Sequence, residues 1–395
     1  MATPLAALTV LDFGQVYNGP YCGFLLAQAG ARVIKVESPT GESLRGRSGS
    51  AKPSFPFRMF NSAKECITAN IKHPDGRQLI KDLVPQVDVV LENFSPGTLA
   101  DNELGSDILC ALNPRLIYAA GTGYGGSGPY RDYLGMDITL QAMSGVMSVT
   151  GDADSPPTKA GAAFCDILGG AHLYAGIVSA LYQREQTGKG AVIDISMQDC
   201  VFPALATQLG TYFQLGHQPA RTGNRHSGMA LAPYNVYQAK DGHVAMICFR
   251  GEHWLRLCDA MGRPELKTDA RFARTKDRVR NMDEVDALVE AWTRTLTKAE
   301  IFAIAQSAGM ICAPVQTLED VVNDPQLLAR GTLAWAEDKW GDQSLKFHTP
   351  IRFKGMQTPR VPDMPSLGAH SESVLLEFLG MDANEVARLR DAQAI

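Results

Sequence analysis

Residues 8–36, LTVLDFGQVYNGPYCGFLLAQAGARVIKV, contain the pattern that decides the fold. The apolar run at 8–13 predicts a strand, residues 19–29 have the apolar spacing of a helix, and 32–36 predict a second strand. A strand, a helix and a further strand in this order form a βαβ unit of a parallel sheet. We therefore expect an α/β protein with a mostly parallel sheet.

The same alternation continues through the first half of the chain. Further predicted elements are helix 75–84, strand 87–94, a helix near 108–112, strand 116–120, a loop at 151–159, an apolar helix at 167–184, strand 191–196 and a helix near 201–214. We expect residues 1–215 to form a large Rossmann-like domain.

The character of the sequence changes near residue 216. Short strand patterns at 234–238 and 243–247 stand beside a charged helical pattern at 276–294, and they predict a smaller inserted α+β domain over 216–329. Strand patterns at 333–336 and 345–353 and two helices between 371 and 394 follow. We expect residues 330–395 to return to the large domain.

Composition excludes several classes of protein. The 395 residues carry 37 Lys and Arg against 42 Asp and Glu, a net charge of −5, so there is no positive excess for a phosphate backbone. Eight cysteines without a CxxC pair indicate free thiols in a reducing compartment. The first residues lack the basic start of a signal peptide, and no window approaches the ~20 apolar residues of a membrane helix. We expect a cytoplasmic protein with no nucleic-acid or membrane partner.

Familiar catalytic motifs are missing. GTGYGG at 121–126 matches the GxGxxG pattern, but Ser-Gly-Pro follows it instead of a helix, so we interpret it as a glycine turn. There is no GxSxG, no GxxxxGK[ST] and no HExxH. We expect neither a metal site nor a permanently bound cofactor.

A carboxylate is the remaining candidate. Asp166 follows the small residues of AGAAFC, precedes ILGG and stands where a long apolar helix is predicted to begin. The free N–H groups of a helix start favour an ionised carboxylate. Gly169 and Gly170 permit a close approach through which such groups stabilise an oxyanion. The alternative is that Asp166 only caps the helix, a frequent role of Asp.

Longer motifs recur along nearly the whole chain. They are LTVLDFGQVYNGP (8–20), GARVIKVESPTGE (30–42), LENFSPG (91–97), NPRLIYAAGTGYGGSGPY (113–130), the Asp166 segment, QREQTGKGAVIDISMQD (183–199), GNRH (223–226), APYNVY (232–237) and CAPVQTLEDVVNDPQL (312–327). In combination they resemble the family III CoA-transferases, which include formyl-CoA transferase and the carnitine and bile-acid CoA-transferases, with α-methylacyl-CoA racemase as a relative.

The resemblance implies a fold and a reaction. It implies a Rossmann-like large domain, a smaller inserted domain and a homodimer of two interlinked chains. Asp166 matches the family's catalytic aspartate, which attacks an acyl-CoA to give an aspartyl anhydride and then an aspartyl-CoA thioester. The implied substrates are an acyl-CoA donor and a small carboxylic acid acceptor, with neither ATP nor a metal.

The resemblance also implies a set of residues that contact CoA. They are Val16, Tyr17, Asn70, Lys72, Asn93, Phe94, Ser95, Met136 and Asp137. Alternative interpretations are a solvated surface lysine for Lys72 and an Asx turn for Asn93. Arg45 and Arg47 are other candidate partners for the CoA phosphates.

Some positions depart from the family pattern. Tyr17 stands where formyl-CoA transferase has glutamine, and Ser38 stands where many members have arginine. Glu65 and Asp101 occupy positions at which a basic residue is common. These departures argue against a specifically formyl-CoA and oxalate pair of substrates.

Position 136 separates two enzyme hypotheses. Racemisation of a 2-methylacyl-CoA needs an acid and a base on opposite faces of the substrate, and the similar racemases have histidine just before the aspartate that matches Asp137. Met136 cannot carry a proton, so the sequence favours the transferase. A non-catalytic CoA-binding protein is the third alternative. Residues 223–232 contain two glycines and are a candidate lid.

Overall fold

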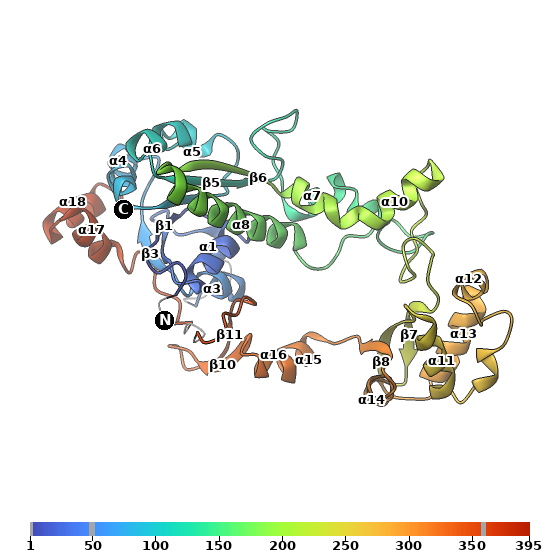
Figure 1. Cartoon of the computed structure of the whole chain (residues 1–395). Coiled ribbons are helices and arrows are strands. Elements are labelled where there is room, and N and C mark those ends of the chain that lie inside the picture. The colour runs from blue at the N-terminus through green and yellow to red at the C-terminus, as the bar shows by residue number, and fades with distance from the viewer. Residues whose placement is uncertain (1–2, 47–51, 357–360) are drawn as a thin grey trace. The chain divides into compact units, whose positions relative to one another are not determined.

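The computed structural model describes residues 3–46, 52–356 and 361–395, and these fall into two compact units (Figure 1). The first unit comprises the chain up to Ser144, Gly161–Phe202 and Asn323–Ile395, and the second comprises Gly145–Ala160 and Pro203–Val322. We expected boundaries near 215 and 330. The second unit instead begins earlier and takes in a separate short segment, which sequence patterns do not reveal.

A six-stranded sheet forms the centre of the first unit. Its order is β3-β2-β1-β4-β5-β6, and every pairing is parallel. The strands are β1 (Thr9–Asp12), β2 (Arg32–Glu37), β3 (Glu65–Thr68), β4 (Val89–Glu92), β5 (Ile117–Thr122) and β6 (Ala191–Ser196). The order reverses between β1 and β4, the place where doubly wound sheets open a crevice at the carboxyl ends of their strands. The expected α/β fold with a mostly parallel sheet is confirmed.

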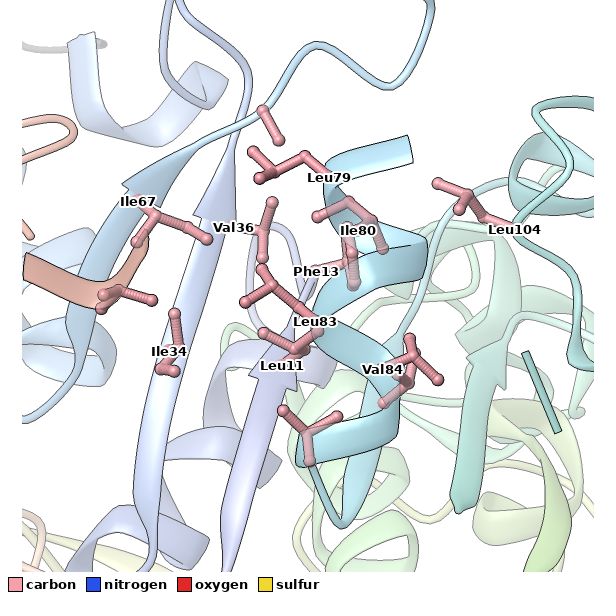
Figure 2. Packing of buried hydrophobic residues seen from close by; sticks show 14 of the residues in the cluster. Leu11, Phe13, Ile34, Val36, Ile67, Leu79, Ile80, Leu83, Val84 and Leu104 are labelled. Carbon is pink, nitrogen blue, oxygen red and sulfur yellow. The ribbon is translucent and has the colours of Figure 1, made fainter. Parts of the chain in front are cut away.

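Helices cover both faces of this sheet because successive strand residues point to opposite sides. On one face Val10 and Val89 pack with Leu26 of α1 (Asn18–Gln28) and Leu173 of α8 (Phe164–Thr187). On the other face, Leu11 packs with Leu79 and Ile80 (Figure 2), and four helices contribute buried residues to this cluster. These helices are α4 (Pro74–Leu83), α6 (Ser106–Leu112), α17 (Ser371–Leu379) and α18 (Ala383–Asp391).

Shorter elements complete the first unit. They are α2 (Ser43–Gly46), α3 (Phe55–Asn61), η1 (Val84–Gln86), α5 (Thr98–Asp101), α7 (Asp137–Met143), α9 (Met197–Val201), α16 (Pro325–Ala329), β10 (Leu333–Glu337) and β11 (Gln343–Phe347). Strands β10 and β11 pair as an antiparallel hairpin. The strand expected at 345–353 therefore starts earlier and ends at Phe347.

The second unit is built on a small antiparallel sheet. Its strands are β7 (Tyr234–Ala239), β8 (Gly242–Ile247) and β9 (Ile311–Pro314). Its longer helices are α10 (Ala206–Leu215), α11 (Gly251–Ala260), α12 (Thr275–Arg280), α13 (Met282–Thr293) and α14 (Lys298–Ala308), with α15 (Leu318–Val322) at its end. Trp254 and Leu257 are fully buried at its core. The single helix expected at 276–294 is two helices, because Asn281 leaves helical geometry with its amide bonded to Arg271 and Asp277.

The helix α8 departs from one expectation drawn from the sequence. By length and composition its 24 residues suffice to cross a membrane, whereas we expected no such window. In the structure α8 packs along α1, β5 and β6, and a third of its apolar window is buried inside the protein. The buried face of α8, with its pair of glycines, is typical of a core helix. The cytoplasmic location stays a prediction.

Candidate active site

The loop after β1 holds two of the residues expected to bind CoA. Val16 has a φ of +60°, a left-handed conformation that is strained for a β-branched residue. Neighbouring groups fix the loop. The amide of Asn93 accepts from the Gln15 N–H at 2.6 Å and donates to the Gln15 carbonyl at 3.0 Å. Asn93 thus clamps another loop, and the alternative of an Asx turn on its own backbone is wrong.

A buried ion pair between Lys35 and Glu42 forms hydrogen bonds to the loop after β1. Lys35 donates to Glu42 at 2.8 Å and to the Gly14 carbonyl at 2.7 Å, and Glu42 also accepts from the Val16 N–H at 3.4 Å. Both side chains of this ion pair are nearly inaccessible to solvent. A buried pair with further hydrogen bonds fixes geometry more than it adds stability, so it holds the strained backbone in place.

A cavity of about 610 Å³ opens at the carboxyl ends of β1 to β4. Residues that follow each strand line it: Phe13 and Gln15 after β1, Ser38–Thr40 after β2, Ala69–Lys72 after β3, and Phe94, Thr98 and Asn102 after β4, together with Val36, Glu37, Arg390, Gln393 and Ile395. The cavity lies where the strand order reverses, as expected for a ligand crevice of this sheet type. The structure brings together the predicted residues Asn70, Lys72 and Phe94 there, whereas Val16, Tyr17 and Ser95 do not line it.

Asn70 joins three segments at the edge of this cavity. Its backbone N–H donates to the Ala394 carbonyl at 2.8 Å, and its side-chain amide donates to the Gln393 carbonyl at 3.1 Å. Its side-chain oxygen accepts from the Lys72 N–H at 3.2 Å. Asn70 therefore uses its amide to hold the C-terminal segment against the loop after β3, and sequence reasoning gave no sign that this segment reaches the cavity.

The ionisable side chains of the cavity wall are Glu37, Lys72 and Arg390. Glu37 is neutralised by Arg45, whose guanidinium lies 2.6 Å from it. Arg45 is also bonded to the Pro365 carbonyl, so it is a structural partner of Glu37 rather than a free phosphate ligand. Arg47, the other candidate, lies outside the described residues.

Asp166 lies in the first turn of α8, and Ala163 occupies the cap position with no side-chain cap. The alternative that Asp166 is the capping residue is therefore wrong. The cap comes from elsewhere in the chain: a carboxylate oxygen of Asp137, at the start of α7, accepts from the Cys165 N–H at 2.9 Å. The other oxygen of Asp137 accepts from Gln141 at 2.6 Å.

The carboxylate of Asp166 is half-buried and takes part in no hydrogen bond or ion pair with the residues that the structure describes. Burial, and then the negative charge of Asp137, raise its pKa to about 7. We expected the helix start to keep this group fully ionised. Removal from water outweighs that effect, because the first-turn N–H of Cys165 is already taken by Asp137. A carboxylate whose pKa is raised by burial and by a neighbouring charge, here that of Asp137, is a candidate functional group.

Gly169 and Gly170 are buried in the second turn of α8 and face α1. A Cβ on Gly169 would stand 2.2 Å from the amide nitrogen of Asn18, and one on Gly170 would stand 2.5 Å from the Asn18 carbonyl. Close packing of the two helices is therefore a sufficient reason for both glycines. Their N–H groups lie beyond the free N–H groups of the first turn, and the expected oxyanion role stays a prediction that this geometry does not favour.

The remaining expected residues lie around the starts of α1 and α7. Tyr17 precedes α1, and its ring meets Phe60 edge-on at 6.0 Å. Met136 precedes α7 with 59% of its surface exposed. Ser95 is exposed in the loop between β4 and α5, where its carbonyl accepts from the Thr98 N–H.

The candidate lid, residues 223–232, belongs to the second unit. Residues 222–225 and 227–229 line a separate cavity of about 680 Å³ in that unit. Arg225 anchors this segment to α13 through Asp283 at 2.6 Å and Asp286 at 2.7 Å. The role as a lid stays a prediction.

A doubly wound parallel sheet with a crevice at its reversal point, and a carboxylate of raised pKa in the same unit, define an α/β protein with a candidate acid site. Comparison with known proteins identifies the family. The chain belongs to CoA-transferase family III, whose family model matches residues 5–371. The resemblance drawn from the sequence motifs is confirmed.

Curated relatives match along almost their entire length. A succinyl-CoA–D-citramalate CoA-transferase of Chloroflexus aurantiacus is 35% identical, covering 99% of this chain and 98% of the relative. An acetyl-CoA:oxalate CoA-transferase of Acetobacter aceti is 36% identical, covering 96% and 97%.

Solved structures agree with this assignment. A CaiB/BaiF family protein from Brucella suis superposes with a TM-score of 0.85 at 35% identity, covering 96% of this chain and all of that one. A hypothetical protein from Mycobacterium tuberculosis gives a TM-score of 0.83 at 30% identity, covering 96% and 99%.

Proposed function

We propose that this protein transfers CoA from an acyl-CoA to a small carboxylic acid, with Asp166 as the covalent nucleophile. The observation that carries the proposal is a carboxylate at the start of α8 that its described neighbours leave free of hydrogen bonds. Membership of the family and the names of the relatives, which act on succinyl-CoA or acetyl-CoA and on small acids, support the reaction type.

The first half of the reaction loads the enzyme. An oxygen of ionised Asp166 attacks the thioester carbonyl, a C–O bond forms, the C–S bond breaks, and CoA leaves as a thiolate. The thiolate then attacks the aspartyl carbonyl of the resulting anhydride. This step forms an aspartyl-CoA thioester and releases the donor's acid as a carboxylate.

The second half repeats these steps with the acceptor. Its carboxylate attacks the aspartyl thioester and gives a new anhydride and CoA thiolate, and attack of the thiolate on the acceptor's acyl carbon restores free Asp166. One thioester replaces another, so no external energy source enters the balance. A carboxylate is a weak nucleophile in water, and its confinement in a partly dry site next to bound substrate offsets this weakness.

The surroundings of Asp166 suit this role. A pKa of about 7 means that a large share of the carboxylates is ionised at neutral pH, while each is less stabilised by hydrogen bonds than an aspartate in water. Asp137 holds the first turn in place through the Cys165 N–H. We assign the cavity at the ends of β1 to β4 to the nucleotide part of CoA.

A trapping experiment tests the proposal. The protein is incubated with succinyl-CoA, acetyl-CoA and a panel of other acyl-CoA donors and then treated with hydroxylamine, and peptides are analysed by mass. We expect a hydroxamate at Asp166 with at least one donor and none in Asp166→Asn. The matched control Asp137→Asn keeps the nucleophile and should still be labelled. An Asp166→Asn variant with undiminished transfer refutes the assignment.

A separate measurement tests the racemase hypothesis. Met136, the residue before Asp137, has no group that carries a proton, so the acid and base pair for racemisation is incomplete at this position. Exchange of the α-proton of a 2-methylacyl-CoA with deuterium, without any change of acid partner, would replace the transferase by the racemase. Tight CoA binding without labelling of Asp166 would favour the third hypothesis, a non-catalytic CoA-binding protein.

We further propose that the protein forms the homodimer of interlinked chains that the family resemblance implies. Several large apolar side chains of the first unit are exposed: Tyr182 of α8 is 71% exposed, Val192 on the edge strand β6 is 60% exposed, and Leu134 before α7 is 75% exposed. Such apolar surface is typical of a protein interface. Light scattering should give twice the chain mass, and Tyr182→Glu should weaken the dimer, whereas Gln186→Glu on the same helix should not.

A further inference from the structure

Two positively charged side chains of the cavity wall have no charged partner. The Lys72 ammonium and the Arg390 guanidinium form no ion pair and no hydrogen bond with any residue that the structure describes. Glu37, the only carboxylate among the wall side chains, is neutralised by Arg45. Lys72 and Arg390 are therefore the two positively charged side chains of the wall that are available to a ligand.

These two residues come from distant parts of the sequence, and the fold places both in the wall of the same cavity. Lys72 lies in the loop after β3, and Arg390 lies in the last turn of α18. The side chain of Asn70 ties the two segments, since it accepts from the Lys72 N–H and donates to the Gln393 carbonyl. Ser38 of the cavity wall is uncharged and adds no positive charge.

Sheet order indicates which part of CoA these charges meet. β3 is one edge of the sheet, whereas α8 with Asp166 packs on β5 and β6 at the other side. The thioester must reach Asp166, so the pantetheine arm runs from the cavity towards β5. The 5′-diphosphate, to which that arm is attached, then lies nearer the middle strands, and the ribose 3′-phosphate lies nearer β3.

We propose that Arg390 together with Lys72 binds the 3′-phosphate of CoA and makes the enzyme discriminate CoA from dephospho-CoA. This inference rests on the proposed function for the identity of the ligand. Arg presents a planar pair of donors to a phosphate and Lys presents a point charge, and both stay hydrated at the exposed edge of the cavity.

Direct binding measurements on the full-length protein test the proposal. Wild type should bind CoA about 5- to 30-fold more tightly than dephospho-CoA, since charge-assisted hydrogen bonds at an exposed site have about this value. Arg390→Gln should weaken CoA by a similar factor, leave dephospho-CoA almost unchanged and abolish the preference. Adenosine 3′,5′-bisphosphate should compete with CoA for wild type better than 5′-ADP, and inorganic phosphate should compete poorly.

Arg388→Gln is the matched control. Arg388 lies on the same turn of α18, is also exposed, and pairs with Asp75 at 3.4 Å instead of facing the cavity wall. Removal of either arginine takes a positive charge from the helix C-terminus, so a general loss of helix stability affects both variants alike. Melting curves check that both fold.

The outcomes separate this inference from the proposed function. If Arg390→Gln binds CoA as wild type does, or loses affinity for CoA and dephospho-CoA equally, the 3′-phosphate assignment is overturned while transfer activity stands. If the binding pattern is as expected but Asp166 is never acylated, the proposed reaction fails and the nucleotide site stands. In active protein, Arg390→Gln should raise KM for the acyl-CoA and leave kcat nearly unchanged.

Discussion

Two aspartates of the first unit are both withdrawn from water, yet their surroundings differ completely. Asp12, at the end of β1, is fully buried, receives the Lys64 ammonium at 2.6 Å and accepts from the Gly14 N–H at 2.7 Å. Lys64 in turn donates to Asn61 and the Pro20 carbonyl. Asp166 is half-buried and has no such partner among the described residues.

The difference separates a structural acid from the acid that we propose as the nucleophile. Every donor of Lys64 and both oxygens of Asp12 are used, so this pair locks β1, α1 and α3 together and has nothing left for a ligand. The carboxylate of Asp166 keeps its lone pairs available. Hydrogen-bond saturation, more than burial, distinguishes the two roles.

Asp166→Asn gives the largest expected effect on activity. An amide cannot form the anhydride, so transfer between any donor and acceptor should fall by at least about 10³-fold. Initial rates with a donor that acylates wild type measure the loss. A variant that retains a tenth of the activity would mean that Asp166 is not the nucleophile.

Asp12→Asn should show the opposite profile. Loss of the negative charge leaves the Lys64 ammonium buried without a counter-charge, and breaking a buried pair in this way costs about 3–5 kcal/mol of unfolding free energy. Chemical denaturation measures the loss. Folded Asp12→Asn should still be acylated at Asp166, and unchanged stability would contradict the distinction drawn above.

The pH dependence of stability provides a third test. The pKa of Asp166 is about 7 in the folded protein against 3.8 ordinarily, so the native state binds more protons than the unfolded state between these values. The free energy of unfolding therefore falls as pH rises through this interval. Asp166→Asn removes this penalty. The free energy of unfolding of the variant minus that of wild type should therefore be about 1–3 kcal/mol larger above pH 7 than below pH 4. A difference that is independent of pH would show that the pKa is not raised.

The smallest expected effect comes from Asp137→Asn. The charge of Asp137 is the second cause of the raised pKa of Asp166, after burial. The variant keeps an oxygen for the Cys165 N–H but removes the charge, so the pKa of Asp166 should fall partway towards its usual range. Because the ionised form attacks, the rise of transfer rate with pH should move to lower pH, and a move to higher pH would exclude Asp137 as a cause.

Much of the sheet was predictable because its local patterns agree with the fold. The unit at 8–36 and strand 191–196 are strongly patterned, and the structure places strands and helices there within a few residues. β3 was missed because its four residues begin with Glu65, which the partner Arg32 neutralises across the sheet. β9 was missed because it too has only four residues and ends in proline.

The site was less predictable because its geometry depends on distant partners. Sequence reasoning identified Asp166 and Asp137 separately, but nothing local indicated that Asp137 caps α8 or that Asp166 is not the cap itself. Similarly, Lys72 was a candidate from its motif, whereas Arg390 and Gln393 carry no motif. They reach the cavity only because α18 packs on the sheet and Asn70 holds the segment that follows it.

Because Asp137 caps α8 from another helix, the surroundings of Asp166 depend on the folding of the whole unit. An isolated peptide of residues 161–187 contains Asp166 but lacks this acceptor, so its first turn should fray and leave the carboxyl group of Asp166 solvated, with a pKa in its usual range. Docking of α7 on α8 supplies the missing acceptor, so the raised pKa of Asp166 belongs to the folded unit and not to the isolated helix.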